Sequence, residues 1–179
     1  MPHKTDANKS YWGLVFPGRI IKLGRPLYGW KVCYTIVKDE SILCGYKAIP
    51  VLVKLRINRG TRVRTGSAIN KLRCAVAHVE EIIDFETEKP LNDCVAHSFH
   101  SRKFKYRVGM TVKPDKKFDP DPGVSCASGI HFFETKSDVV WYYYGGSSYQ
   151  AYIYYINNVY HSVNGAALDR IYKGDYEND

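Results

Sequence analysis

The sequence has no apolar run approaching the roughly 18 to 20 residues that cross a bilayer, and its opening stretch MPHKTDANKSYW lacks the apolar centre of a secretory signal. Its five cysteines are scattered singly, with no C-x-x-C pair. Such spacing argues against a disulfide framework, so we expect reduced, mostly buried thiols. No high-specificity catalytic or cofactor motif appears in the chain. From these absences we expect a soluble protein, made in the cytosol, with no membrane span and no cofactor.

Aromatic rings and positive charge are abundant instead. Aromatic residues make up 14% of the chain, including fifteen tyrosines, and such side chains suit the half-buried surface of a β-sheet. The formal net charge of +8 favours polyanionic partners such as nucleic acid, phosphorylated ligands, anionic lipid or an acidic protein. A chain of 179 residues fits one domain and is long enough to bury a core without disulfides or metal.

Short apolar runs broken by glycine and proline fill residues 11–57, which is typical of antiparallel strands. The stretch VLVKLRI alternates cleanly, so one face should carry Val51, Val53, Leu55 and Ile57 and the other Leu52, Lys54 and Arg56. KLRCAVAHVEEII alternates in the same way and predicts one further strand. Residues 84–103 are polar and contain Pro90, so we expect a long loop there.

The segment TKSD predicts the start of a helix, with Thr135 as N-cap and Asp138 three residues later. We expect this helix over roughly 136–144, ending at Gly145-Gly146. The stretch SSYQAYIYYINNVYH fits a helix or a strand equally well.

The fold class expected is α+β, mostly antiparallel β-sheet with one or two short helices in the C-terminal third. The domain organisation expected is a flexible arm 1–10, a β-rich core domain 11–140, a Tyr-rich segment 141–172 packed on the core or a partner, and an acidic tail 173–179.

Four sequence blocks occur in a fixed order: KLRC, Y-x-V-G, V-x-P-D and C-x-x-G-I-H-F-F. With them, roughly residues 45 to 140 resemble an uncharacterised domain of giant DNA virus and bacteriophage proteins, often found beside pentapeptide repeats. The resemblance implies a viral source and a small sheet-based domain. It implies no activity and supplies no catalytic residues, so function is inferred from the residues themselves.

Cys126 and His131 are the first candidate site. A cysteine nucleophile needs an imidazole to hold it as thiolate and a third group to orient that imidazole, a role open to Asp115, Asp119 or Asp121. The spacing fits no catalytic signature, however. The alternative is a structural corner in which His131 hydrogen-bonds into the sheet.

The segment CVAHSFH places Cys94, His97 and His100 at three-residue intervals, a spacing compatible with soft ligands of zinc. Tetrahedral zinc needs a fourth ligand, which Cys126 or His131 could supply. The alternative is a polar surface loop that happens to contain histidines.

A basic segment between Val51 and Val79 contains no acidic residue. If VLVKLRI paired with KLRCAVAHV, an outward basic ribbon would form and could follow a phosphate backbone. Its members are Lys54, Arg56, Arg59, Arg62, Arg64, Lys71 and Arg73. The alternative is a solvated strand face with no ligand.

The Tyr-rich segment predicts a protein interface, because aromatic anchors dominate interface energetics. Its expected contact residues are Trp141, Tyr144, Tyr149, Tyr152, Tyr155 and Tyr160. The alternative is a second small core with tyrosine hydroxyls at its rim.

The function we expect is that of a non-enzymatic viral accessory or virion-associated protein, in the virion or the host-cell cytoplasm. It would bind a protein partner, or itself, through the Tyr-rich segment. One alternative is a nucleic-acid or nucleotide-binding protein that uses the basic ribbon. Another is a Cys/His-dependent hydrolase or transferase.

Overall fold

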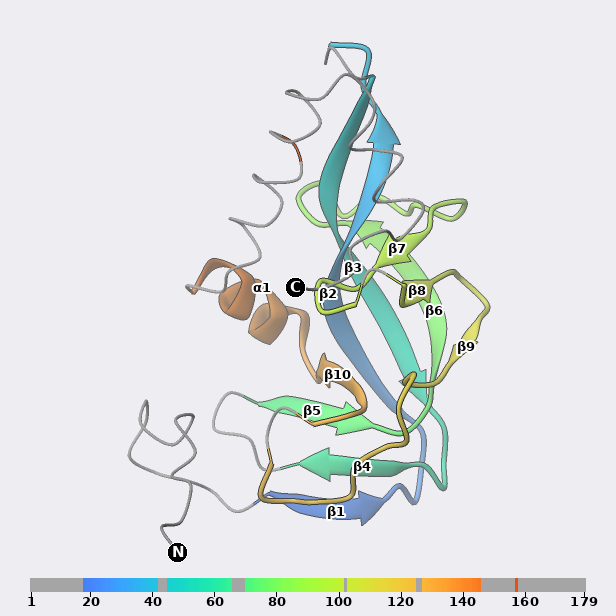
Figure 1. The fold of residues 1–179 in the computed structure, drawn as a ribbon, viewed down its shortest axis with the longest axis vertical. Coiled ribbons are helices and arrows are strands. Elements are labelled where there is room, and N and C mark those ends of the chain that lie inside the picture. The colour runs from blue at the N-terminus through green and yellow to red at the C-terminus, as the bar shows by residue number, and fades with distance from the viewer. Residues whose placement is uncertain are drawn as a thin grey trace, which may run out of the picture.

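A computed structural model describes residues 18–41, 45–65, 70–101, 103–124, 127–145 and 157. The described residues form ten strands in one sheet and the helix α1 (Lys136–Tyr144). The two longest strands, β2 (Leu27–Lys38) and β3 (Tyr46–Ile57), pair along their whole length. They form a twisted hairpin along the long axis of the molecule (Figure 1).

The other strands extend the sheet on both sides of this hairpin. The order of strands across the whole sheet is β1 (Arg19–Lys22), β4 (Arg62–Thr65), β5 (Lys71–Cys74), β10 (Ile130–Phe133), β2, β3, β6 (Ala77–Asp84) and β9 (Thr111–Val112). Off this path, β7 (Ala96–His97) pairs with β2 and with β8 (Lys105–Tyr106). All of these pairings are antiparallel, and β1, β4 and β5 run across the lower end of the hairpin (Figure 1). The α+β class, with mostly antiparallel sheet, is therefore confirmed.

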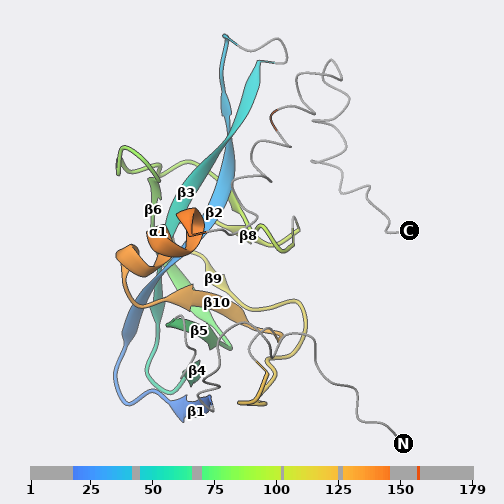
Figure 2. The same cartoon turned by 90° about the vertical axis from the view of Figure 1, so that its left-hand side faces the viewer.

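Alternation along β3 separates two apolar clusters. Val51, Val53, Leu55 and Ile57 join the main core, while Leu52 packs in a second cluster beneath α1. That second cluster contains Val139 and Tyr143, and α1 covers this face of the hairpin (Figure 2). The predicted two-faced strand is confirmed. Burying both faces at Leu52 is possible because the helix shields one of them from water.

The helix begins and ends where its capping residues predict. The Thr135 hydroxyl accepts a hydrogen bond from the Asp138 backbone N–H at 3.1 Å, and Gly145 is the C-cap. Both caps satisfy backbone groups that the helix leaves without partners. The expected domain boundary between residues 140 and 141 falls inside α1, whose Tyr143 belongs to the folded core. The arm 1–10 and the tail 173–179 lie outside the described residues.

The stretch KLRCAVAHVEEII is two strands, so the prediction of one strand is wrong. A bend at Ala75 and Val76 separates β5 from β6. Strand β5 pairs with β4 and β10, whereas β6 pairs with β3. Cys74 and Ala77, on either side of the bend, are both buried in the main core. The alternating pattern cannot reveal such a change of partner, because each half alternates correctly by itself.

The expected loop 84–103 contains the short strand β7, where His97 pairs with Tyr34 of β2. A turn at Gly109, with φ of 83°, lies between β8 and β9. Near the hairpin tip, Asn157 bonds both backbone groups of Ala48: its Oδ1 accepts from the Ala48 N–H at 2.8 Å, and its Nδ2 donates to the Ala48 carbonyl at 3.2 Å. This amide takes the place of a neighbouring strand beyond the point where β6 pairing ends at Val51.

Candidate functional site

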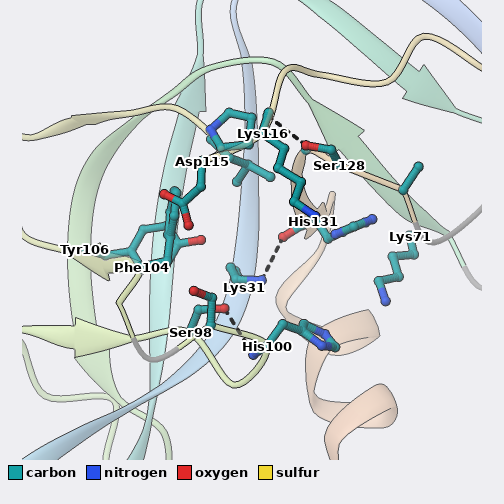
Figure 3. Close-up of a pocket in the computed structure, with 15 residues that line it drawn as sticks. Lys31, Lys71, Ser98, His100, Phe104, Tyr106, Asp115, Lys116, Ser128 and His131 are labelled. Carbon is teal, nitrogen blue, oxygen red and sulfur yellow. Dashed lines mark hydrogen bonds between the residues drawn. The ribbon is translucent and has the colours of Figure 1, made fainter. Parts of the chain in front are cut away.

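A pocket of about 490 Å³ opens where the edge of β2 changes partners. Trp30 pairs with Phe133 of β10, and Tyr34 pairs with His97 of β7. Between these two pairings, residues 31–33 have no strand neighbour on that side among the described strands. The loops before β8 and before β10 surround the gap, and its volume is in the range of small-molecule sites (Figure 3).

Lys31 lies at the centre of this gap and is only 8% exposed. Its Nζ donates to the backbone carbonyl of His131 at 3.3 Å, and no carboxylate pairs with it among the described residues (Figure 3). Burial lowers the pKa of this amine, and neighbouring Lys71 lowers it further. A buried amine is costly to keep charged without an anionic partner, which makes Lys31 the unusual feature of the site.

Other basic groups line the same pocket. Lys71 of β5 is half-buried and its Nζ donates to the Tyr142 hydroxyl at 3.4 Å. Burial, Lys71, Lys31, Arg73 and His100 together hold the pKa of His131 at about 3. Partial burial, Lys31 and Lys71 hold the pKa of His100 at about 4. Both imidazoles are therefore neutral at neutral pH, first because burial disfavours their charged forms and then because Lys31 and Lys71 give the pocket a positive potential.

One wall of the pocket is fixed by Arg73, which is 1% exposed. Its Nη2 donates to the carbonyls of Asp119 and Asp121 at 3.0 and 3.1 Å, and its guanidinium lies 5.6 Å from the Phe118 ring. Gly129 passes directly over this side chain with φ of 155°, where a β-carbon would lie 2.4 Å from Arg73 Cγ. Only glycine fits this close approach, so the loop before β10 is held firmly against β5.

Polar donors and apolar rings complete the lining. Ser98 is buried, and its Oγ accepts from the His100 N–H at 3.3 Å, which leaves the hydroxyl proton to donate. In Figure 3, Phe104 and Tyr106 lie with Asp115 on one side of the pocket, Lys71 lies on the other, and Lys31 lies between them. The pocket thus has a cationic end and an end with rings and one carboxylate, and the side chain of Lys116, next to Asp115 in the chain, extends toward His131 (Figure 3).

The first predicted constellation is brought together only in part. His131 and Asp115 line the same pocket, but Cys126 lies outside the described residues, so a nucleophilic pair stays untested. The ring Nε2 of His131 is buried without a hydrogen-bond partner, and its neighbours are cations. A ring nitrogen in such cationic surroundings is placed to contact a bound anion.

The three residues of the zinc prediction have different surroundings. Cys94 is half-buried, His97 stacks on Tyr34 with ring centres 5.4 Å apart, and His100 lies at the pocket rim. Within the described ranges, no group of three or more His, Cys, Asp or Glu side chains is placed to hold a metal ion.

The described thiols Cys33, Cys74 and Cys94 are free. Burial raises the pKa of Cys33 and that of Cys74 to about 12, and it also raises the pKa of Cys94. These three side chains are therefore protonated at neutral pH and are poor nucleophiles.

The basic ribbon is wrong as a continuous outward surface. Strand β3 pairs with β6, so Lys54 lies 3.7 Å from Glu81, and Arg56 bonds Glu80. Arg64 is 3% exposed and donates to the Pro122 carbonyl, and Arg73 is buried as described above. Lys71 lines the pocket. Of the seven residues, only Arg59 and Arg62 are both exposed and unpaired with a carboxylate in the described part of the chain.

The predicted aromatic interface is described only at its start. Trp141 and Tyr144 on α1 are 61% and 56% exposed. Tyr149, Tyr152, Tyr155 and Tyr160 lie outside the described residues. No described helix is long and apolar enough to cross a membrane.

Sequence reasoning missed Lys31 and Ser98 as site residues. The one available signal was the lysine in the apolar stretch GWKVCYTIV, a charge where a buried strand should have none.

Comparison with known proteins gives a family without a function. The model of a family of unknown function (DUF5758) matches residues 18–139. The chain belongs to this family. The DUF5758 match begins well before the roughly 45–140 expected, takes in β1 and β2, and includes every residue of the pocket lining. No curated protein and no solved structure matches the chain. A viral source and neighbouring pentapeptide repeats stay predictions.

Proposed function

We propose that this chain is a non-enzymatic binding module that holds a phosphate-like anion in the Lys31 pocket. The observation that carries the proposal is the ammonium of Lys31, buried with one backbone carbonyl and no carboxylate partner among the described residues. An anion that enters the pocket would supply the missing counter-charge. Lys71 and the Ser98 hydroxyl are further donors in the same lining.

The histidines support an anion over a neutral ligand. A bound anion raises the pKa of any nearby base, because it favours the charged form. It would offset the part of the lowering that comes from Lys31 and Lys71, while burial, the largest cause for both His131 and His100, would remain. Even as neutral rings the two imidazoles each carry one N–H that can donate to the ligand.

A binding role is favoured over catalysis by the state of the reactive groups. The imidazole of His131 has a pKa of about 3, far below that of an effective general base at neutral pH. Cys33 and Cys74, the most buried described thiols, have pKa values of about 12. Neither group offers the activated nucleophile that hydrolysis or transfer requires.

The test is phosphate binding, measured by titration calorimetry and by the shift in thermal unfolding, with sodium chloride of equal ionic strength as the solvent control. Wild-type protein should bind phosphate, Lys31→Met should lose at least a hundredfold in affinity, and Lys71→Met should lose at least tenfold. Lys54→Met is the matched control, since Lys54 lies outside the pocket beside Glu81. A phosphate effect no larger than that of chloride, or one unchanged in Lys31→Met, would contradict the proposal.

Protein docking through α1 is a second candidate function, favoured by the exposure of Trp141 and Tyr144. The two side chains are three residues apart and therefore share a helix face. The partner we test is a second copy of the chain. Sedimentation should show self-association that Trp141→Ala with Tyr144→Ala abolishes. A wild-type protein that stays monomeric at high concentration would refute self-docking.

A role as a viral accessory or virion-associated protein, in the virion or the host-cell cytoplasm, also belongs to this proposal. Its support is the resemblance of the four sequence blocks to a domain of viral proteins. Immunoblotting of purified particles against infected-cell cytoplasm would test it.

A further inference from the structure

The two ends of the Lys31 pocket differ in chemistry. Lys31 and Lys71 give one end its positive potential, and the neutral imidazole of His131 lies beside them. At the other end Asp115 is accompanied by the rings of Phe104 and Tyr106 (Figure 3). Asp115 is the one carboxylate in the described lining of the pocket. A simple inorganic anion would use the cationic end alone and leave the remaining surface without a partner.

The volume also exceeds the need of an inorganic anion. A space of about 490 Å³ is in the range of pockets that enclose small organic ligands. A flat ring beside Phe104 would bury apolar surface and gain stacking energy. Tyr106 lies against Phe104 with ring centres 5.1 Å apart and is itself 2% exposed, so it supports Phe104 from the core.

Asp115 decides what kind of ring would fit. Its side chain is exposed at the rim, and an ionised carboxylate accepts hydrogen bonds but donates none. The negative charge of Asp115 would weaken the binding of a simple anion in this pocket. A ligand that also carries N–H donors would instead form hydrogen bonds with the carboxylate. Two adjacent N–H donors on one ring edge match the two carboxylate oxygens best. Guanine carries such an edge, while adenine carries a single amino donor beside an acceptor.

We propose that the ligand of this pocket is a guanine mononucleotide, with its phosphate at Lys31 and Lys71 and its base beside Phe104 with its N–H edge toward Asp115. This assignment rests on the proposed anion-binding function and names its ligand class. The order of affinity expected is GMP first, at least tenfold tighter than AMP or ribose 5-phosphate. Guanosine, which lacks the phosphate, should bind at least tenfold more weakly than GMP.

The experiment is titration calorimetry of the full chain with GMP, AMP, ribose 5-phosphate, guanosine and inorganic phosphate. Asp115→Asn should remove the preference for GMP over AMP. It should make ribose 5-phosphate bind somewhat tighter, because a negative charge leaves the pocket. Asp93→Asn, an exposed aspartate outside the lining, is the matched control and should keep the GMP preference.

The outcomes distinguish failure of the guanine assignment from failure of the anion-binding function. If ribose 5-phosphate and phosphate bind in a Lys31-dependent way but GMP binds no tighter, the guanine assignment is overturned and the anion site stands. A GMP preference that survives Asp115→Asn also overturns the assignment, because the base edge would then lie elsewhere. If none of the phosphate compounds binds, the proposed function itself fails.

Discussion

Replacing Lys31 with methionine should make the protein without ligand more stable, although it removes the central residue of the proposed site. Desolvation of a buried ammonium costs several kcal/mol, and replacing buried charge by an apolar side chain of similar size often stabilises a fold by about 1–4 kcal/mol. That range already includes the interactions lost with the charge, here the single 3.3 Å hydrogen bond to the His131 carbonyl. The net expectation is a gain of about 1–2 kcal/mol in the free energy of unfolding.

Urea unfolding followed by tryptophan fluorescence, with calorimetry alongside, measures this gain in buffer free of phosphate. For a protein of this size about 1 kcal/mol shifts Tm by roughly 2–4 °C, so Tm should rise by about 2–8 °C. Lys54→Met, which removes a half-exposed lysine paired with Glu81, should change stability by less than about 1 kcal/mol.

Added phosphate should reverse the order of stability. At a phosphate concentration a hundred times Kd, wild-type protein gains about 2.7 kcal/mol from binding, and the variant, which binds at least a hundredfold more weakly, gains no more than about 0.4 kcal/mol. The wild type then becomes the more stable of the two. A Lys31→Met protein that is less stable than wild type in both buffers would refute the reasoning, since Lys31 would then be a structural residue.

Three further predictions concern pH, the core and the helix. The pKa of His131 is about 3 in the fold and about 6.5 in the unfolded chain, so the unfolded chain binds the proton first and stability falls as the pH is lowered below 6.5. The free energy of unfolding should be about 2 kcal/mol lower at pH 5 than at pH 7.5. Urea unfolding of His131→Asn at the same two pH values should show a smaller loss. Gly29→Ala should destabilise the protein by about 2–3 kcal/mol, because a β-carbon there would lie 2.2 Å from a ring carbon of Phe132 in β10. Gly24→Ala, which has open space around it, should leave stability unchanged, and Tm values of the two variants distinguish them. Thr135→Ala should cost about 1 kcal/mol of unfolding free energy through loss of the N-cap, and the exposed Ser137→Ala should cost much less.

The parts of the fold that could be predicted from the sequence are those set by neighbours along the chain. Alternation assigned the two faces of residues 51–57, and the Thr135 cap with Gly145 set the limits of α1. The separation of β5 from β6 could not be predicted in this way. It depends on pairings with β10 and β3, which lie far away in the sequence and leave no mark in the local pattern.

The pocket could not be predicted from the sequence either, because its lining also comes from segments far apart in the chain. His131 and Asp115 were grouped with Cys126, and Lys71 with the basic ribbon, and nothing in the chain shows that these side chains surround Lys31. Arg73 was expected to face solvent, but carbonyl groups of residues 119 and 121 bury it. Local composition shows that a segment is basic, whereas the distant loop decides which of its side chains reach water.

The amide of Asn157 has a consequence for how the protein behaves in concentrated solution. An open backbone edge can recruit strands from other chains and start intermolecular β-sheet growth, and proteins commonly block such edges. At Ala48 the block is a single side chain that fills the N–H and the carbonyl together. A chain cut short before residue 157 would keep the sheet and the pocket but uncover this backbone, so a shortened form should aggregate where the full chain stays dispersed.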